Sequence, residues 1–196
     1  MPTDLDQILR SIELIPQKFF QRLVGIDGLG ASGKTTIVDG IKRLHAEISI
    51  IRLEDFYLPK MNRTTGILEN HVVSPDFDWD RLEGQVFDAV RRNLLVKYQK
   101  YLWREDRWGG WIEIPATSWI IVVGVYALQS RFFSAYDYTI WVETPRGERI
   151  RRMIEREGES VAKEWQEKWL PREERYFELD HPDKRAASTI FANTSG

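Results

Sequence analysis

Gly28-Leu29-Gly30-Ala31-Ser32-Gly33-Lys34-Thr35-Thr36 completes the pattern G-x-x-x-x-G-K-[ST] of a phosphate-binding loop. In such a loop the glycines let successive backbone N–H groups curve around a phosphate, and the lysine adds a mobile positive charge. The hydroxyl of Thr35 is then positioned to bind Mg²⁺. A strand-like apolar run at 23–27 precedes the loop, and a helical pattern at 36–46 follows it, as this kind of site requires. The sequence therefore predicts that 28–36 holds the phosphates of a nucleotide.

Composition and length exclude several classes of protein. The 196 residues are sufficient for one domain with a substantial core, and we expect a single domain over 1–196. A net charge of −2 gives no drive toward nucleic acid or an acidic membrane surface. The absence of cysteine excludes disulfides and thiol chemistry. No signal-like or bilayer-length apolar segment is found, so we expect a cytoplasmic protein; a homo-oligomeric state is left open.

Apolar runs alternate with amphipathic segments along the chain. We predict strands at 23–27, 48–53, 119–123, 138–142 and 189–191. We predict helices at 4–15, 36–46, 79–101, 146–157 and 159–175, with an irregular tryptophan-rich segment at 103–115. The central strands lack polar alternation, which is typical of parallel strands covered on both faces. The pattern predicts a three-layer α/β/α sandwich with a parallel sheet, an N-terminal helix within 1–20 and a small helical lid at about 146–175.

Two adjacent carboxylates end the second predicted strand. In a parallel sheet, function gathers at the carboxyl ends of the strands, and Glu54 and Asp55 stand at such an end. Their side chains point to opposite sides if the extended geometry persists, so one of them faces the terminal phosphate. We predict that Asp55 acts as the base that accepts a proton from an attacking hydroxyl, with Glu54 in support. Together with Thr35, both are candidate Mg²⁺ ligands.

Three arginines recur on the predicted helix at 146–157. Arg149, Arg152 and Arg156 stand at i, i+3 and i+7, so they share one face of that helix. Guanidinium groups on one face suit a phosphoryl group in transfer, whose charge they stabilise. We predict that Arg149 and Arg152 act in catalysis together with Lys34, and that Arg156 binds the nucleotide. The alternative is a solvated face on which these arginines pair with neighbouring glutamates.

The combination of the phosphate-binding loop with Glu54-Asp55-Phe56-Tyr57 and Ser74-Pro75-Asp76-Phe77-Asp78-Trp79 resembles the uridine kinase family. That family is related to pantothenate kinase and phosphoribulokinase among the P-loop kinases. The resemblance continues through Gly124-Val125-Tyr126-Ala127-Leu128 and reaches 182–190. It implies a nucleoside-kinase-like fold, ATP and Mg²⁺ as cofactors, and phosphorylation of a hydroxyl on a small molecule. It also implies a lid whose arginines close on the phosphates.

The expected acceptor side of the site departs from the family. We predict that the acceptor contacts the following residues: Tyr57, His71, Asp76, Tyr101 and Trp103. A glutamate of the family that helps to hold Mg²⁺ is replaced by Val123, and other acidic positions by Val73 and Leu102. Because ribose hydroxyls need strongly polar partners, these replacements leave the identity of the acceptor open.

Two functions remain open from the sequence. One is an ATP-dependent small-molecule kinase, most like a nucleoside kinase with an altered acceptor site. The other is an ATP-binding module, regulatory or structural, with little or no transfer activity. Retention of Asp55, Lys34 and the arginines favours the kinase, because a binding module has no need of a base. The replacement at Val123 favours the binding module. A guanine-specific switch is disfavoured by the absence of an Asn-Lys-x-Asp element.

Overall fold

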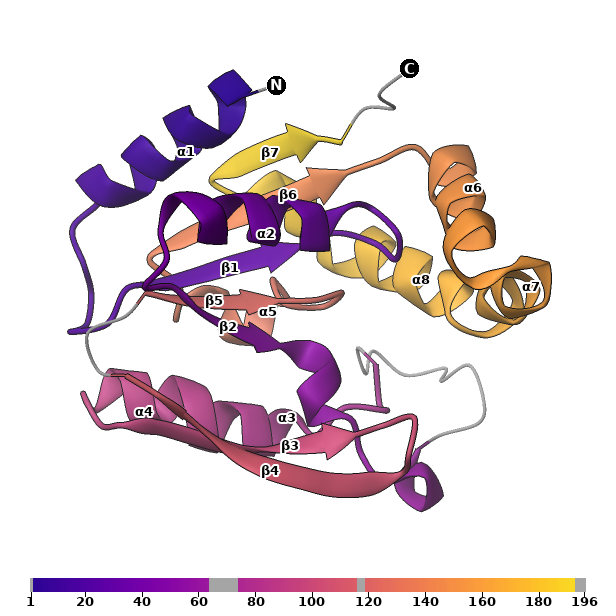
Figure 1. The fold of residues 1–196 in the computed structure, drawn as a ribbon, viewed down its shortest axis with the longest axis horizontal. Helices are drawn as coiled ribbons and strands as arrows, with labels where there is room; N and C mark the ends of the chain where they lie inside the picture. The colour runs from indigo at the N-terminus through magenta and orange to yellow at the C-terminus, as the bar shows by residue number, and fades with distance from the viewer. Residues whose placement is uncertain (1, 64–73, 116–118, 193–196) are drawn as a thin grey trace.

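A five-stranded parallel sheet forms the centre of the protein (Figure 1). The structure is a computed structural model, and it describes residues 2–63, 74–115 and 119–192. The strand order is β2-β5-β1-β6-β7. Their bounds are β1 Leu23–Asp27, β2 Ser49–Arg52, β5 Ile120–Val123, β6 Tyr138–Glu143 and β7 Ser188–Phe191. The predicted parallel sheet and its five strands are confirmed.

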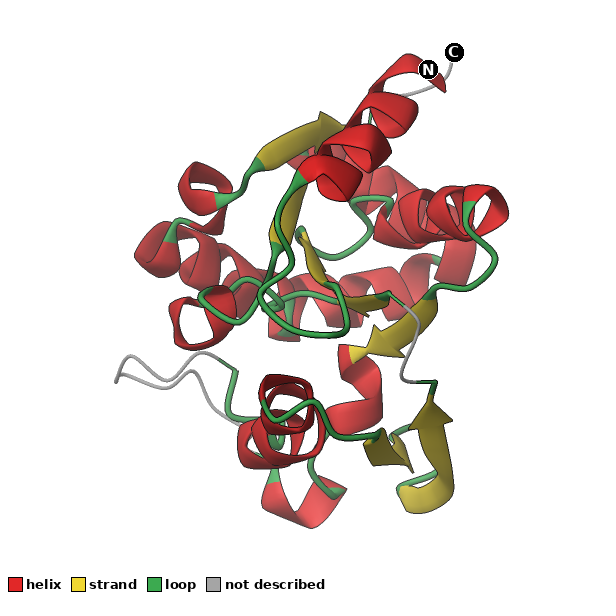
Figure 2. Ribbon diagram, turned by 90° about the vertical axis from the view of Figure 1, so that its left-hand side faces the viewer, coloured by secondary structure: helices red, strands yellow, loops and turns green. Residues whose placement is uncertain are grey.

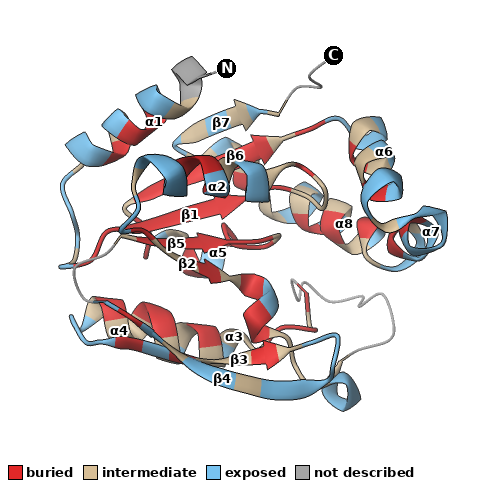
Figure 3. Cartoon of the chain, in the orientation of Figure 1, coloured by how far each residue is buried: buried red, intermediate tan, exposed pale blue. Residues whose placement is uncertain are grey.

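Helices cover both faces of the sheet, which confirms the predicted three-layer α/β/α sandwich (Figures 1 and 2). On one face, α1 (Pro2–Leu14) and α2 (Lys34–Leu44) bury Ile12 and Ile41 against Val24 and Ile26 of β1. On the opposite face, the elements share a second core with the sheet. They are α3 (Trp79–Leu82), η3 (Glu83–Phe87), α4 (Asp88–Arg91), α5 (Ser130–Phe133) and α8 (Leu170–Asp180). Every residue of β1 and β5 is buried, because both faces of these strands are covered (Figure 3).

The helix predicted over 79–101 is wrong in its second half. The continuous helical stretch formed by α3, η3 and α4 ends near Asn93, which adopts a left-handed backbone with φ of 53°. The chain then forms β3 (Val96–Leu102), which pairs with β4 (Arg107–Ile114) as an antiparallel hairpin. Val96 and Tyr98 are buried while Lys97 between them is exposed, an alternation typical of a strand. The segment predicted as irregular is therefore mostly a strand, and its largely exposed outer side is seen in Figure 3.

The predicted lid consists of α6 (Arg146–Glu157) and α7 (Glu159–Lys168), followed by α8. Gly158, with φ of 86°, separates the first two helices. Met153, Ala162, Trp165 and Leu170 form a small core of their own, and Ala31 of the phosphate-binding loop packs against it. The tip of the loop is therefore in contact with the segment predicted to form a lid. In the part of the chain that the structure describes, no helix has the length and apolarity needed to cross a membrane.

Candidate active site

The phosphate-binding loop joins β1 to α2 and folds around its own lysine. Gly33 adopts a left-handed backbone with φ of 99° directly before α2, so the loop needs glycine there. The Lys34 ammonium donates hydrogen bonds of 2.6 Å to the carbonyl of Gly28 and 3.0 Å to that of Leu29. Burial lowers the pKa of Lys34, while the negative charges of Asp27 and Glu173 oppose that shift. A cation is thus held over the loop, where a bound phosphate would neutralise it.

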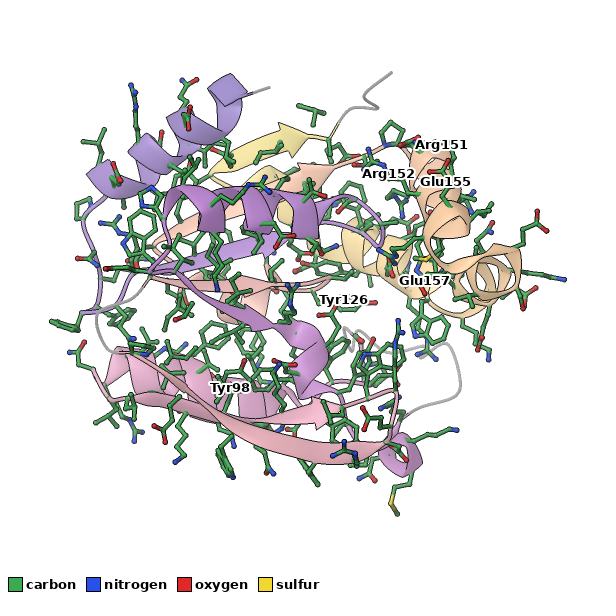
Figure 4. All side chains as sticks on the ribbon, viewed as in Figure 1. Tyr98, Tyr126, Arg151, Arg152, Glu155 and Glu157 are labelled. Atoms are coloured by element: carbon green, nitrogen blue, oxygen red, sulfur yellow. The ribbon has the colours of Figure 1, made fainter. Side chains whose placement is uncertain are left out.

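Asp27, the last residue of β1, anchors the base of the loop. Its carboxylate is fully buried and accepts hydrogen bonds from the backbone N–H groups of Gly28 at 2.6 Å, Tyr126 at 3.1 Å and Leu128 at 2.8 Å. The hydroxyl of Tyr176 donates a fourth bond of 2.7 Å. Burial outweighs these bonds and raises the pKa of Asp27 to about 6. Asp27 therefore ties the loop to α8 and to the turn after β5, where Figure 4 shows Tyr126.

The three predicted arginines have different environments. Arg149 is only 4 % exposed, and its Nε and Nη1 have no hydrogen-bond partner among the described residues. Its Nη2 lies 3.6 Å from Glu174, and its charge acts on Lys34. A buried guanidinium with unpaired N–H groups is costly, so this arginine is poised for an anionic ligand.

Arg152 lies beside the phosphate-binding loop, on the side of α6 nearer the sheet (Figure 4). Its Nη1 donates a 3.3 Å hydrogen bond to the carbonyl of Ser32, and its Nε donates one of 2.6 Å to Glu148. Arg156, in contrast, is exposed and pairs with Glu157 at 3.0 Å. The hydrogen bonds described for Arg156 go to Glu157 and Met153, and Met153 belongs to the small core against which Ala31 of the loop packs.

The two carboxylates after β2 face different surroundings. Glu54 is exposed and lines the pocket described below. Its negative charge partly offsets the lowering of the Lys34 pKa by burial. Asp55 is 9 % exposed; its carboxylate accepts a 3.0 Å hydrogen bond from Tyr98 and lies 3.8 Å from the Lys100 ammonium. Burial raises the pKa of Asp55. The pair lies in a short 3-10 helix, η1 (Leu53–Phe56), so the extended geometry on which the predicted opposite orientation depended does not persist. Glu54 lines the pocket, whereas Asp55 contacts Tyr98 and Lys100.

A pocket lies at the carboxyl end of the sheet, next to the phosphate-binding loop, since its lining residue Glu173 is hydrogen-bonded to Gly30. Tyr57 stacks on Phe77 with ring centroids 4.2 Å apart, which gives the pocket an aromatic side. Asp76 also lines the pocket and pairs with Arg172 at 2.6 Å. The lining residues are Leu53, Glu54, Tyr57, Ser74, Asp76, Phe77, Gly124, Val125, Tyr126, Trp169, Arg172 and Glu173. The pocket therefore combines aromatic side chains with carboxylates and one guanidinium.

Two of the five predicted acceptor contacts, Tyr57 and Asp76, line this pocket. Tyr101 and Trp103 do not line it. The Tyr101 hydroxyl donates a hydrogen bond to Asp106, and the Trp103 ring packs against the Tyr57 ring with centroids 5.5 Å apart. The register of the hairpin shifts near Tyr101: Gln99 pairs with Trp111 and Tyr101 with Trp108, so β4 carries one extra residue there. His71 lies outside the described residues, as does the replaced acidic position Val73.

Glu173 of α8 belongs to the site, although the sequence analysis does not select it. It is 6 % exposed, and its Oε2 accepts a 2.6 Å hydrogen bond from the backbone N–H of Gly30. The indole of Trp165 donates a 3.1 Å bond to its Oε1. In a helix rich in acidic and basic residues, one glutamate is indistinguishable from its exposed neighbours. Only the apolar spacing of Trp165, Leu170 and Tyr176 hints that this face of the segment is buried.

The residues present fit a Mg²⁺ ion that is bound mainly by phosphates and water. No group of three acidic or histidine side chains suited to a metal occurs within the described ranges 2–63, 74–115 and 119–192. Mg²⁺ in phosphoryl-transfer sites needs only one or two protein oxygens beside the substrate phosphates. Thr35 is exposed at the start of α2. In the sheet, Arg52 of β2 lies opposite Val123 of β5. Glu54, two residues after Arg52, therefore lies close to the strand end at which Val123 replaces the glutamate of the uridine kinase family.

Comparison with known proteins finds relatives of the chain by sequence. No family model matches the chain. The chain is 27% identical over 143 residues to a uridine kinase of Borrelia hermsii, covering 69% of this chain and 67% of that protein. It is 28% identical over 174 residues to a uridine kinase of Mycoplasma pneumoniae, covering 80% and 79% of the two chains. The predicted resemblance to uridine kinases is therefore confirmed.

Solved structures agree on the fold. A candidate uridine kinase of Bacillus stearothermophilus superposes with a TM-score of 0.72 at 18% identity, over 95% of this chain and 96% of that chain. A candidate fructose transport system kinase of Silicibacter superposes with a TM-score of 0.73 at 17% identity, also over 95% of this chain and 96% of that chain. A D-glycerate 3-kinase of Cryptococcus neoformans gives 0.53 at 14% identity, covering 93% and 84%. The protein thus has the fold of the uridine kinase-like P-loop kinases.

Proposed function

We propose that this protein is an ATP-dependent phosphotransferase that moves the γ-phosphate of ATP to a hydroxyl group of a small molecule. The observation that carries the proposal is the junction of two sites. The phosphate-binding loop, with Lys34 and with Arg149, whose Nε and Nη1 have no hydrogen-bond partner among the described residues, adjoins a pocket that contains Glu54. A transferred phosphoryl group needs this arrangement of a donor cradle, neutralising cations and an acceptor pocket with a base.

Within this proposal, Glu54 is the base that accepts the proton of the attacking hydroxyl. Its side chain lines the pocket, whereas Asp55 is occupied by Tyr98 and Lys100. Arg149 and Lys34 neutralise the charge on the transferred group, and Thr35 would hold Mg²⁺, which would supply further positive charge to the phosphates. Asp76 and the aromatic side formed by Tyr57 suit a nucleoside-like or sugar-like acceptor with several hydroxyls.

The second candidate function is an ATP-binding module that transfers phosphate poorly or not at all. The observation in its favour is Val123, which is buried at the end of β5, where the family carries a metal-holding glutamate. On the other hand, the neighbouring Glu54 supplies a carboxylate at the adjacent strand end. We therefore place the kinase first.

The test is an ADP-release assay with Mg·ATP against nucleosides, pantothenate-like acids and sugar alcohols. At least one acceptor is expected to raise ADP release above the rate of water hydrolysis. Glu54→Gln is then expected to lower acceptor-dependent turnover by about 10²-fold or more, because general-base contributions are of this size. Asp55→Asn is the matched control, with turnover expected within tenfold of wild type. The reverse order would make Asp55 the base, and tight ATP binding without any productive acceptor would favour the binding module.

A further inference from the structure

The buried carboxylate of Glu173 makes a hydrogen bond that has no role in the proposed reaction. It reaches from α8 to the phosphate-binding loop and accepts the backbone N–H of Gly30 at 2.6 Å. Backbone N–H groups of such a loop are the donors that cradle phosphate oxygens. A side-chain carboxylate therefore already occupies one anion-binding donor of the loop.

Glu173 also stands between the two halves of the site. It bonds to the loop and at the same time lines the acceptor pocket with Glu54 and Gly124. A phosphoryl group in transfer must pass between the donor loop and the acceptor pocket. The terminal phosphate, which lies nearest to the acceptor, is thus the part of the nucleotide that meets this carboxylate.

The cations around Glu173 are those that a terminal phosphate requires. Lys34 and Arg149 both lower the pKa of Glu173, although burial raises it overall. Lys34 reaches the β- and γ-phosphates in loops of this type, and Arg149 retains unpaired N–H groups among the described residues. Glu173 and a terminal phosphate are like charges that compete for one N–H donor and the same two cations.

The backbone of α8 is attached on both sides of Glu173. Tyr176, one helical turn further, is bonded to the buried Asp27 at 2.7 Å, and Arg172 is paired with Asp76 at 2.6 Å. The indole N–H of Trp165 holds the other carboxylate oxygen. Rotation of the Glu173 side chain frees the loop while the helix stays in place, since a glutamate has several staggered rotamers.

We propose that Glu173 is an internal phosphate mimic that occupies the terminal-phosphate end of the loop, and that ATP displaces it whereas ADP does not. This inference rests on the proposed function, because it assigns ATP to the same loop. Glu173 thereby weakens the binding of the triphosphate relative to the diphosphate. It is a residue that sets nucleotide specificity.

The test is calorimetric titration of the full chain with Mg²⁺ and either ADP or the non-hydrolysable β,γ-imido analogue of ATP. Glu173→Gln keeps the side-chain shape and removes the charge. It is expected to tighten binding of the ATP analogue about tenfold while changing ADP affinity less than threefold, a coupling of ordinary size. The matched control is Glu178→Gln, an exposed glutamate on the same helix, which is expected to leave the ratio of the two affinities unchanged.

Trp165→Phe provides a second variant, should Glu173→Gln fail to fold. It keeps the charge but removes the N–H that orients the carboxylate, so the affinity ratio is expected to shift in the same direction by a smaller factor. An unchanged ratio in the folded variants, or an equal gain for both nucleotides, would overturn the inference. Failure of the proposed function looks different: the wild type would bind neither nucleotide, or Lys34→Ala would bind both as well as wild type does.

Discussion

The hydroxyl of Tyr176 donates a 2.7 Å hydrogen bond to the carboxylate of Asp27, joining α8 to the end of β1 directly before the phosphate-binding loop. These two residues are 149 positions apart in the chain. The acceptor of this bond is a fully buried titratable group, and burial raises the pKa of Asp27 to about 6. The free energy of unfolding is therefore expected to depend on the protonation of Asp27.

The first prediction concerns pH. The pKa of Asp27 is about 6 in the folded state against an ordinary value of 3.8, so the folded state binds more protons than the unfolded state between these values. The contribution of Asp27 to the free energy of unfolding therefore falls as pH rises from about 4 to about 6. The full effect of such a shift is on the order of 3 kcal/mol.

Urea unfolding of wild type and Asp27→Asn between pH 4 and 7 measures this effect. Because asparagine does not titrate, the variant is expected to lose less stability than wild type across that window. Tyr176→Phe is the control; it removes one hydrogen bond, costs about 1 kcal/mol and leaves Asp27 able to titrate, with its pKa raised further by the loss of that bond. Parallel pH profiles for wild type and Asp27→Asn would contradict the prediction.

The second prediction separates activity from stability at Arg149. Replacing Arg149 with methionine is expected to lower kcat/KM by about 10²-fold or more, because a buried cation at the transferred phosphate is lost. The same change is expected to leave the melting temperature equal or higher, since the guanidinium is buried with unpaired N–H groups. Arg156→Met is the matched control, with kcat/KM expected within threefold of wild type. Equal losses in both variants would contradict this assignment.

The third prediction uses two glycines. Gly84 lies within the helical stretch of η3, and a Cβ atom there would meet nothing within 4 Å. Gly84→Ala is therefore expected to stabilise the protein by about 0.5–1 kcal/mol. At Gly124 an added Cβ would lie 2.7 Å from the Cβ of Leu53, so Gly124→Ala is expected to destabilise and to disturb the neighbouring Glu54. Thermal unfolding of the two variants checks both signs.

The fourth prediction concerns Mg²⁺. If Thr35 holds the metal, ATP binding by the wild type weakens when EDTA replaces Mg²⁺, while Thr35→Val binds ATP weakly in both conditions. Titrations with and without Mg²⁺ give this comparison. Thr36→Val, the adjacent exposed position, is the control and should retain the dependence on Mg²⁺. An unchanged response in Thr35→Val would remove this residue from the metal site.

Local sequence patterns were sufficient to predict those parts of the structure whose conformation depends on residues close together in the chain. The phosphate-binding loop is one such case, because glycine, lysine and threonine at fixed spacing shape their own backbone. The buried strands at 23–27 and 120–123 are another, since continuous apolar runs indicate strands covered on both faces. The helical pattern failed past Asn93, where one left-handed residue ends the helix and an alternating strand begins.

Long-range contacts decided what the local pattern left open. The sequence by itself predicted the fold class, a phosphate-binding loop motif and a pair of carboxylates at a strand end. Only the tertiary structure turned Glu54 toward the pocket and Asp55 toward Tyr98, because the hairpin packs against one side of that strand end. It alone brought Glu173 to Gly30, which lies 143 residues earlier in the chain. A backbone N–H next to a charged helix is recognised only after the chain has folded, since no sequence spacing encodes that contact.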